Sequence, residues 1–392
     1  MKIPPPLPRL CLALTLLAAA VSGPALATAT AAENYLMYVG TYTGPKCKGI
    51  YAFRFDAATG ATEPLGMVGE SVNPSFLAVH PNGKNLYAVN EISEFGGKKV
   101  GAVTAFSIDL QTAKLTALSQ GSAGGAGPCH LVVDKAGKNV LVANYGGGSV
   151  ACLPLGPDGA VSDPTAFIQH TGTGMSNGKP KSSHAHSINL DAANRLAFAA
   201  DAGLDKIFLY DFDATKGSLT PHATPFTAVA SGNGPRHFAF HPQGKFAYAI
   251  NETVCSMTAF SYDAARGELK EIQTLSTLPA GESVKPGYST AEVVAHPSGR
   301  FLYGSNRGHD TIVVFAIDAD SGKLTYVENQ STGGKIPRNF NVDPTGRYLF
   351  AANSNSGNIV IFKIDAQTGR LTPTGTVLEV PSPVCLRFVK VP

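Results

Sequence analysis

The chain has 392 residues, of which 15% are charged, and its formal net charge is +3. So small a net charge, part of which lies in the first few residues, gives no indication of a nucleic-acid or anionic-membrane partner. The 42 glycines and 27 prolines are spread along the sequence rather than gathered in a linker. Together with the low charged fraction, this composition favours β structure over a helical protein.

A removable leader is predicted at the amino-terminal end. Basic residues precede an apolar run from Leu10 to Val21, and an A-x-A cleavage pattern follows at residues 25–27. The apolar run has about a dozen residues, fewer than the roughly 20 that a membrane-spanning helix needs. We therefore expect a signal peptide over residues 1–27, with cleavage as late as residue 32. The mature protein is expected in the periplasm or secreted, without a membrane segment.

The cysteines do not indicate a disulfide framework or a zinc site. Cys11 lies in the leader, and the remaining cysteines are odd in number and show no C-x-x-C spacing. We expect them to pack as small apolar residues, although one bridge after export remains open. The mature chain contains Cys47, Cys129, Cys152, Cys255 and Cys385.

A repeat of about fifty residues follows the leader and decides the predicted architecture. Its first clear copy reads FLAVHPNGKNLYAVNE, and each copy holds four short apolar or alternating runs separated by turn signals such as Asn82-Gly83. Four strands per repeat are typical of a propeller blade. The absence of tryptophan excludes WD-type propellers and counts against tryptophan-docked quinone propellers. The six copies begin at Phe76, His130, Ser187, His237, Glu292 and Asn339.

The two ends of the repeat region predict a seventh blade. YLMYVGTY and GIYAFRFDAATGATEPLG supply its second to fourth strands, and PVCLRFVKV at residues 383–391 supplies its first. The predicted fold is therefore all-β, a seven-bladed β-propeller of four-stranded blades over residues 33–392, closed by the C-terminal strand. Closure of this kind removes open sheet edges, so deletion of residues 383–392 is expected to destabilise the whole fold.

Polar residues gather where the first strand of each repeat begins and where the second ends. Because neighbouring strands of a blade alternate in direction, these two positions lie on one face of the disc. The repeated strand-end residues, such as Asn251 and Asn353, are expected to bond their own turns. The residue that follows them varies between repeats, which favours a functional role: Tyr42, Glu91, Tyr145, Ala202, Glu252, Arg307 and Ser354.

Several long motifs resemble the blade signatures of the seven-bladed lactonase family, which includes bacterial 6-phosphogluconolactonases and fungal muconate-lactonizing enzymes. These motifs are HAHSINLD, GPRHFAFHP with AINE, TAEVVAHPSGRFLYGSNRG and PRNFNVDPTGRYLFAAN, and they cover nearly the whole mature chain. The resemblance implies a catalytic group of His186, Arg236, Glu252 and Arg307. It also implies a lactone hydrolase active in carbohydrate metabolism.

The residue types of this group suit the opening of a lactone. A carboxylate or imidazole can activate water, and guanidinium groups can hold an anionic substrate and stabilise an oxyanion. Either Glu252 or His186 would be the base, and the sequence leaves that choice open. Six further residues of the same face are candidates for substrate binding: His184, His130, His237, Glu292, Arg338 and Glu91.

Other features are expected to be structural. His80, His241 and His296 stand at the far end of the first strands and are predicted to be turn residues. The run Gly146-Gly147-Gly148 is expected to be a tight connection, since no helix follows it. The insertion from His170 to Lys181 is expected to be a surface loop, with a flap over the mouth as the alternative.

The leading hypothesis is hydrolysis of a sugar lactone without a bound cofactor or metal, by a monomer that binds no nucleic acid. The leader makes a phosphorylated, cytosolic lactone a doubtful substrate. A lactonizing cycloisomerase would use the same residues. A calcium-dependent lactonase with oxygen ligands from Asn251, Glu252 and Asn353 is a further alternative, against which the nearby arginines count. The last alternative is an exported propeller that serves as a binding scaffold and has no catalytic activity.

Overall fold

The computed structural model describes residues 1–6, 33–176 and 178–391, and the predicted signal peptide lies mostly outside the described residues. Residues Ala32–Pro392 form one compact unit. This unit holds seven four-stranded antiparallel sheets and one two-stranded sheet, and no helix occurs in the part of the chain that is described. Among those residues, none belongs to a helix long and apolar enough to cross a membrane.

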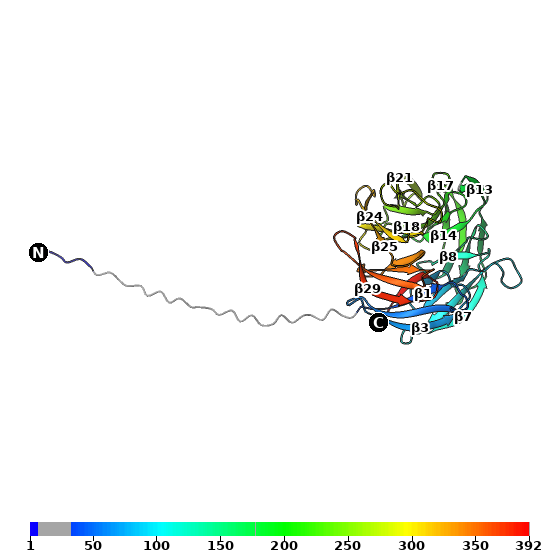
Figure 1. The fold of residues 1–392 in the computed structure, drawn as a ribbon, viewed down its shortest axis with the longest axis horizontal. Coiled ribbons are helices and arrows are strands. Elements are labelled where there is room, and N and C mark those ends of the chain that lie inside the picture. Colours follow the sequence, from blue (N-terminus) through cyan, green and yellow to red (C-terminus); the bar gives the residue numbers. More distant parts are fainter. Residues whose placement is uncertain (7–32, 177, 392) are drawn as a thin grey trace. The chain divides into compact units, whose positions relative to one another are not determined.

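The seven sheets are the blades of a propeller, arranged in chain order around an axis (Figure 1). Their first strands contact one another in a closed ring, so they are the innermost strands. From blade 1 to blade 7 the innermost strands are β30 (Pro383–Lys390), β4 (Leu77–Val79), β8 (Pro128–Val133), β14 (Ala185–Leu190), β18 (Pro235–Phe240), β22 (Ser289–Ala295) and β26 (Pro337–Val342). The second strands, in the same order, are β1 (Asn34–Thr41), β5 (Asn85–Asn90), β9 (Asn139–Asn144), β15 (Leu196–Asp201), β19 (Phe246–Asn251), β23 (Phe301–Arg307) and β27 (Tyr348–Asn353).

The outer half of each blade completes the four strands. The third strands are β2 (Gly49–Asp56), β6 (Ala102–Ile108), β10 (Ser149–Pro154), β16 (Lys206–Asp213), β20 (Ser256–Asp263), β24 (Thr311–Ile317) and β28 (Asn358–Ile364). The fourth strands are β3 (Thr62–Glu70), β7 (Leu115–Ser122), β11 (Ala166–Gln169), β17 (Ser218–Ala228), β21 (Glu268–Ser276), β25 (Leu324–Ser331) and β29 (Leu371–Glu379).

The ring closes as the split blade predicts. β30 pairs antiparallel with β1, with Arg387 opposite Tyr38 and Phe388 opposite Met37. The sheet order β3-β2-β1-β30 therefore joins the last strand to the first three. In Figure 1 the C-terminal end of the chain lies at the blade drawn in blue, which holds β1 and β3.

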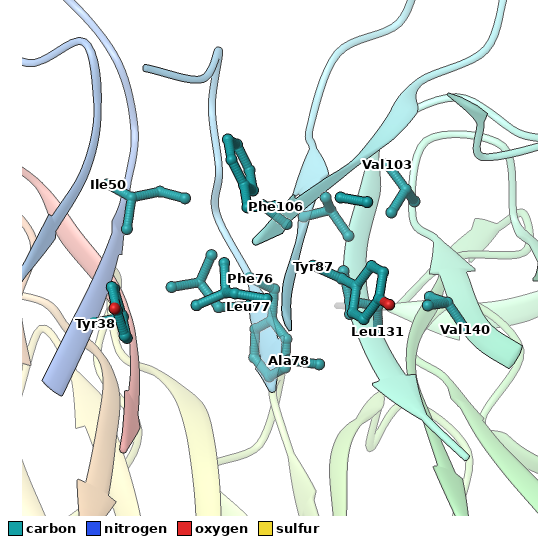
Figure 2. Packing of buried hydrophobic residues seen from close by; sticks show 14 of the residues in the cluster. Tyr38, Ile50, Phe76, Leu77, Ala78, Tyr87, Val103, Phe106, Leu131 and Val140 are labelled. Atoms are coloured by element: carbon teal, nitrogen blue, oxygen red, sulfur yellow. The ribbon is translucent and has the colours of Figure 1, made fainter. Parts of the chain in front are cut away.

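Apolar side chains fill the spaces between blades. The second strands are buried except at Asn34 of β1 and Arg307 of β23, and their alternate side chains face the two neighbouring sheets. One cluster joins Tyr38 of blade 1, Phe76 and Tyr87 of blade 2, and Leu131 and Val140 of blade 3 (Figure 2). The blades are thus held together by continuous packing that passes from each sheet to the next.

Three histidines on the face opposite the candidate site tie successive blades together. Nε2 of His80, His241 and His296 lies 3.0, 2.8 and 2.8 Å from a carbonyl oxygen of the next blade. These carbonyls belong to the turn glycines Gly137, Gly299 and Gly346. The prediction of turn residues is confirmed, and each histidine also bonds between blades.

Candidate functional site

In four of the seven blades, a β-bulge at the start of the inner strand sets one side chain at the mouth of the axial channel. In blade 5, Pro235 pairs with Asn251 and His237 pairs with Ile250, so Arg236 has no partner on β19. A bulge interrupts the regular alternation of a strand and re-aims the side chain. The same irregularity leaves four residues of different blades unpaired: Cys129, His186, Arg236 and Arg338.

Glu252 lies between two guanidinium groups. Nη2 of Arg307 donates to Oε1 of Glu252 at 2.7 Å, and Nε of Arg236 lies 3.7 Å from Oε2. Arg236 is only 1% exposed, and its Nη1 donates to the carbonyl oxygen of Ala291 at 2.7 Å. Arg307 also donates to the carbonyl oxygen of Thr290. The cluster therefore bridges blades 5 and 6.

Burial and charge act in opposite directions on Glu252. Burial raises the pKa of its carboxyl, but Arg236 and Arg307 together outweigh burial and hold that pKa below its usual value. Burial lowers the pKa of Arg236 to about 9, helped by Arg338 and Arg307 and opposed by Glu252. All these groups are charged at neutral pH. A carboxylate held in this way by two cations is a weak proton acceptor.

Arg338 is a third cation of this mouth. Its guanidinium lies over the ring of Tyr42, 5.2 Å from the centroid. The Tyr42 hydroxyl donates to Oε2 of Glu91 at 2.9 Å, and the Ser75 hydroxyl donates to the same oxygen. Within residues 33–176 and 178–391 the Arg338 guanidinium makes no hydrogen bond and no ion pair. Its donors are therefore unused by the neighbouring blades.

His186 and His184 meet at Tyr145. His184 stacks on the Tyr145 ring at a centroid distance of 4.5 Å, and its Nδ1 lies 3.0 Å from the Tyr145 carbonyl oxygen. His186 contacts the same ring edge-on at 5.1 Å, and its Nδ1 lies 3.6 Å from Sγ of Cys129. Burial holds the pKa of His186 well below its usual value, aided by Arg236, so this imidazole is neutral.

His130, His237 and Glu292 lie one residue deeper along their strands than the mouth residues. Nδ1 of His237 is 2.7 Å from Oε1 of Glu292, and both side chains are buried. The His237 ring stands edge-on to His130 and His186 at 5.2 and 5.3 Å. These predicted binding residues therefore form a second layer, in contact with the mouth group through His186.

A polar pocket of about 520 Å³ opens beside Glu252. Its walls come from two insertions, with Ser176 and Lys181 on one side and Val284 to Ser289 on the other. The described residues of the first insertion after His170 are exposed or partly buried, as expected of a surface loop. The insertion is more regular than expected, because β12 (Gly174–Ser176) and β13 (Lys179–Lys181) pair as a hairpin, and its position beside Glu252 favours the flap alternative.

The strand-end amides bond the turn that follows their own strand, as predicted, and Asn353 also bonds the preceding blade. Nδ2 of Asn251 donates to Ser256 and Thr258, while Nδ2 of Asn353 donates to Oδ1 of Asn358 and to the carbonyl oxygen of Thr332, which follows β25. No group of three His, Cys, Asp or Glu side chains placed to hold a metal ion occurs in the described parts of the chain. All five cysteines of residues 33–391 are free and buried.

Sequence reasoning did not include Tyr42 and Tyr145 among the site residues. Both occupy the variable position after the second strand, so the signal was present in the repeat. Tyr42 orients Glu91 and underlies Arg338, while Tyr145 supports the two histidines. Only the structure shows that these rings touch the charged residues.

The family model described as Lactonase, 7-bladed beta-propeller, matches residues 36–388. The chain belongs to this lactonase family. The match confirms the resemblance and the seven-bladed fold predicted from the repeat. The predicted enzyme class, a lactone hydrolase, agrees with the names of several relatives.

Two relatives and one solved structure place the chain within the lactonase family. The 6-phosphogluconolactonase of Bacillus subtilis is 37% identical over 356 residues, covering 91% of this chain and 99% of that protein. The 6-phosphogluconolactonase of Formosa agariphila is 37% identical over 78% of this chain and 86% of its own length. The periplasmic gluconolactonase of Pseudomonas aeruginosa superposes with a TM-score of 0.84 at 35% identity, covering 92% of this chain and 100% of that one.

Proposed function

We propose that this lactonase-family protein hydrolyses a sugar lactone at the channel mouth, with His186, Arg236, Glu252 and Arg307 as its central group. The observation that carries the proposal is the set of guanidinium donors left without acceptors around Glu252. Nε of Arg236 is buried without a hydrogen bond, and the guanidinium of Arg338 has no acceptor among the described residues. Arginine donors that lack an acceptor are suited to bind the carbonyl oxygen of a lactone as that oxygen gains negative charge.

Each group has a proposed role. Arg236 and Arg338 bind the carbonyl and stabilise the oxyanion of the tetrahedral intermediate, as the planar fork of arginine allows. Glu252 fixes Arg307 and Arg236 in place and keeps their charges from repelling one another. The neutral imidazole of His186, the ring of His184 and the carboxylate of Glu91 bind substrate hydroxyl groups. Cofactors and metals have no assigned part in this scheme.

The substrate class follows from the relatives and the leader together. The relatives are a 6-phosphogluconolactonase in Bacillus subtilis and a periplasmic gluconolactonase in Pseudomonas aeruginosa. We propose a signal peptide at residues 1–27, a mature propeller of residues 33–392 acting as a monomer, and a periplasmic or secreted location. An unphosphorylated gluconolactone is then the expected substrate, because phosphorylated sugars are intermediates of the cytosol.

A substrate panel tests this proposal. Mature protein is assayed with D-glucono-δ-lactone, 6-phosphogluconolactone and a muconate in the lactonizing direction, with and without chelator. Hydrolysis of gluconolactone that the chelator leaves unchanged is the expected result. Activity only with muconate would establish the cycloisomerase instead, and loss of activity with chelator would establish a metal-dependent lactonase. If no lactone is turned over, the remaining hypothesis is a propeller that binds a partner without catalysis.

A further inference from the structure

The buried pair of His237 and Glu292 has no part in the function proposed above. Oε1 of Glu292 accepts from Nδ1 of His237 at 2.7 Å and from the amide of Val293 at 3.0 Å. Oε2 accepts from Nδ2 of Asn339. His237, Glu292 and Asn339 lie on β18, β22 and β26, so three successive blades fix the carboxylate. A contact between two blades would need only one of these hydrogen bonds.

The bond to Glu292 decides which nitrogen of His237 can accept a proton. Because Nδ1 donates to a carboxylate, the Nε2 of the neutral ring carries a lone pair. No hydrogen bond to this Nε2 occurs within residues 33–176 and 178–391. His237 as a whole is 4% exposed, and it lines a cavity in which its Nε2 can accept a hydrogen bond.

His130 beside it has the opposite tautomer. Its Nδ1 accepts from the amide of Ile188 at 3.3 Å, which leaves the hydrogen on Nε2. The two rings stand edge-on at 5.2 Å. An unused donor and an unused acceptor are therefore carried by two neighbouring rings, and both rings line the same cavity.

The same two rings line a cavity of about 440 Å³ inside the axial channel. The cavity extends to Ala295 and Phe240, the last residues of β22 and β18, at the end of the strands away from the mouth. The lining of the cavity is part polar and part apolar, and a cavity of that size has ample room for several water molecules. Water therefore has a place in the channel on the inner side of the mouth group.

We propose that His237 is the general base of this lactonase, that Glu292 is its positioning residue, and that the nucleophilic water comes from the axial cavity. The inference rests on the proposed function and identifies the proton acceptor that it leaves open. The lactone would be held from the mouth side by Arg236 and Arg338, while the water lies on the inner side between His130 and His237.

The step balances without a co-reactant. The water oxygen bonds to the lactone carbonyl carbon, and its proton passes to Nε2 of His237. The ring C–O bond then breaks, and the imidazolium returns that proton to the departing alkoxide. The product is the open hydroxy acid, and the Glu292 carboxylate stabilises the transient imidazolium as the acid of a catalytic triad does.

The alternative bases are less well placed. Both oxygens of Glu252 face guanidinium groups, and Nδ1 of His186 faces a thiol rather than a carboxylate. At His237, burial lowers the pKa and Glu292 raises it, so the ring is neutral yet keeps some basicity. The other groups facing His237 are Arg236, Arg338, His130 and His186, with Arg387 near Glu292.

Kinetics of His237→Gln and Glu292→Gln test the proposal, with His241→Gln as matched control. His241 lies on the loop after the same strand, is equally buried and makes its own bond to the next blade. We expect His237→Gln to lower kcat about 10²- to 10⁴-fold with little change in KM. The control should keep wild-type kcat per folded protein.

Glu292→Gln supplies a readout that a structural role would not move. Loss of the carboxylate lowers the pKa of His237 further, so the acid limb of the kcat profile should shift to lower pH as kcat falls. A His237→Gln enzyme within about threefold of wild type would overturn the proposal. An unshifted acid limb in Glu292→Gln would also overturn the proposal. This second test still applies if circular dichroism shows that His237→Gln is unfolded. If the wild-type protein hydrolyses no lactone, the proposed function itself is refuted.

Discussion

Nη2 of Arg307 donates to Oε1 of Glu252 at 2.7 Å, across the seam between blades 6 and 5. The two residues stand at the same place in successive repeats, directly after or at the end of the second strand. The site is therefore made from neighbouring copies of one unit. Its charge balance depends on which residue each copy carries at that position.

Replacing Glu252 by Gln tests how the charge balance of the site depends on this carboxylate. The variant keeps the side-chain shape but leaves the guanidinium groups of Arg236 and Arg307 without their shared carboxylate. We expect kcat/KM to fall about 10²- to 10³-fold, as for the loss of a group that orders transition-state donors. Inorganic phosphate should raise the Tm of the variant more than that of the wild type, because an added anion replaces the lost charge. Equal phosphate effects in both proteins, measured by thermal melts, would contradict this account.

Arg338→Met should weaken substrate and product binding, because the cation over Tyr42 is the donor with no competing partner. We expect a loss of about 10²-fold in kcat/KM. Arg338→Lys should recover part of the loss, although lysine cannot form the two-pronged contact. Inhibition by gluconate measures the same interaction without turnover. An unchanged inhibition constant in Arg338→Met would refute the assignment.

Stability should fall as the pH drops below about 6.5. Burial lowers the pKa values of His130, His186 and His237 in the folded state, so the unfolded chain binds their protons first. Each such histidine adds a slope of about 1.4 kcal/mol per pH unit once the pH lies between its unfolded and folded pKa values. The free energy of unfolding in urea between pH 8 and pH 5 measures this, and His130→Gln should flatten the slope. A pH-independent free energy in that range would show the prediction wrong.

Removal of β30 (Pro383–Lys390) should unfold the propeller. The deletion uncovers one edge of β1 and breaks the ring contacts with β26 and β4. Loss of a cooperative thermal transition is expected. Lys390→Ala is the control, since this side chain is exposed and its strand pairing is unaffected. A truncated chain with a wild-type Tm would mean that the ring does not need its closing strand.

His296→Ala should cost about 1–3 kcal/mol of unfolding free energy, because the Gly346 carbonyl of the next blade loses its partner in a buried place. His80→Ala should cost less, as His80 is only partly buried. Urea titrations of both variants give the comparison. Catalytic constants should not change, since both residues lie on the face opposite the mouth. The reverse order of stability losses would contradict the burial argument.

Repetition made the blades and the closing strand predictable, because each copy shows the same strand and turn signals. It also placed Arg236, Glu252 and Arg307 on one face, since the start of the first strand and the end of the second strand lie on the same face of every blade. The bulges at Arg236 and His186 could not be predicted, because an extra residue in one strand leaves no mark in the alternation of apolar residues.

Side-chain contacts between blades could not be predicted from the sequence either. His237 and Glu292 start successive copies of the repeat, yet nothing in the order of residues says that Nδ1 of one meets a carboxylate of the other. Their contact follows from the radius of the inner ring and from rotamers that only packing selects. The hairpin of residues 174–181 was missed because its strands are short and rich in glycine and lysine.

The pairing of β1 with β30 also bears on when this protein can finish folding. Tyr35 finds its partner, Lys390, only after the six intervening blades have been synthesised. Contacts between such distant parts of a chain form slowly, because a very large loop must close first. Until then the nascent chain is an open arc with two unsatisfied edges. The last strand to be synthesised, residues 383–390, therefore decides when the propeller becomes a closed ring.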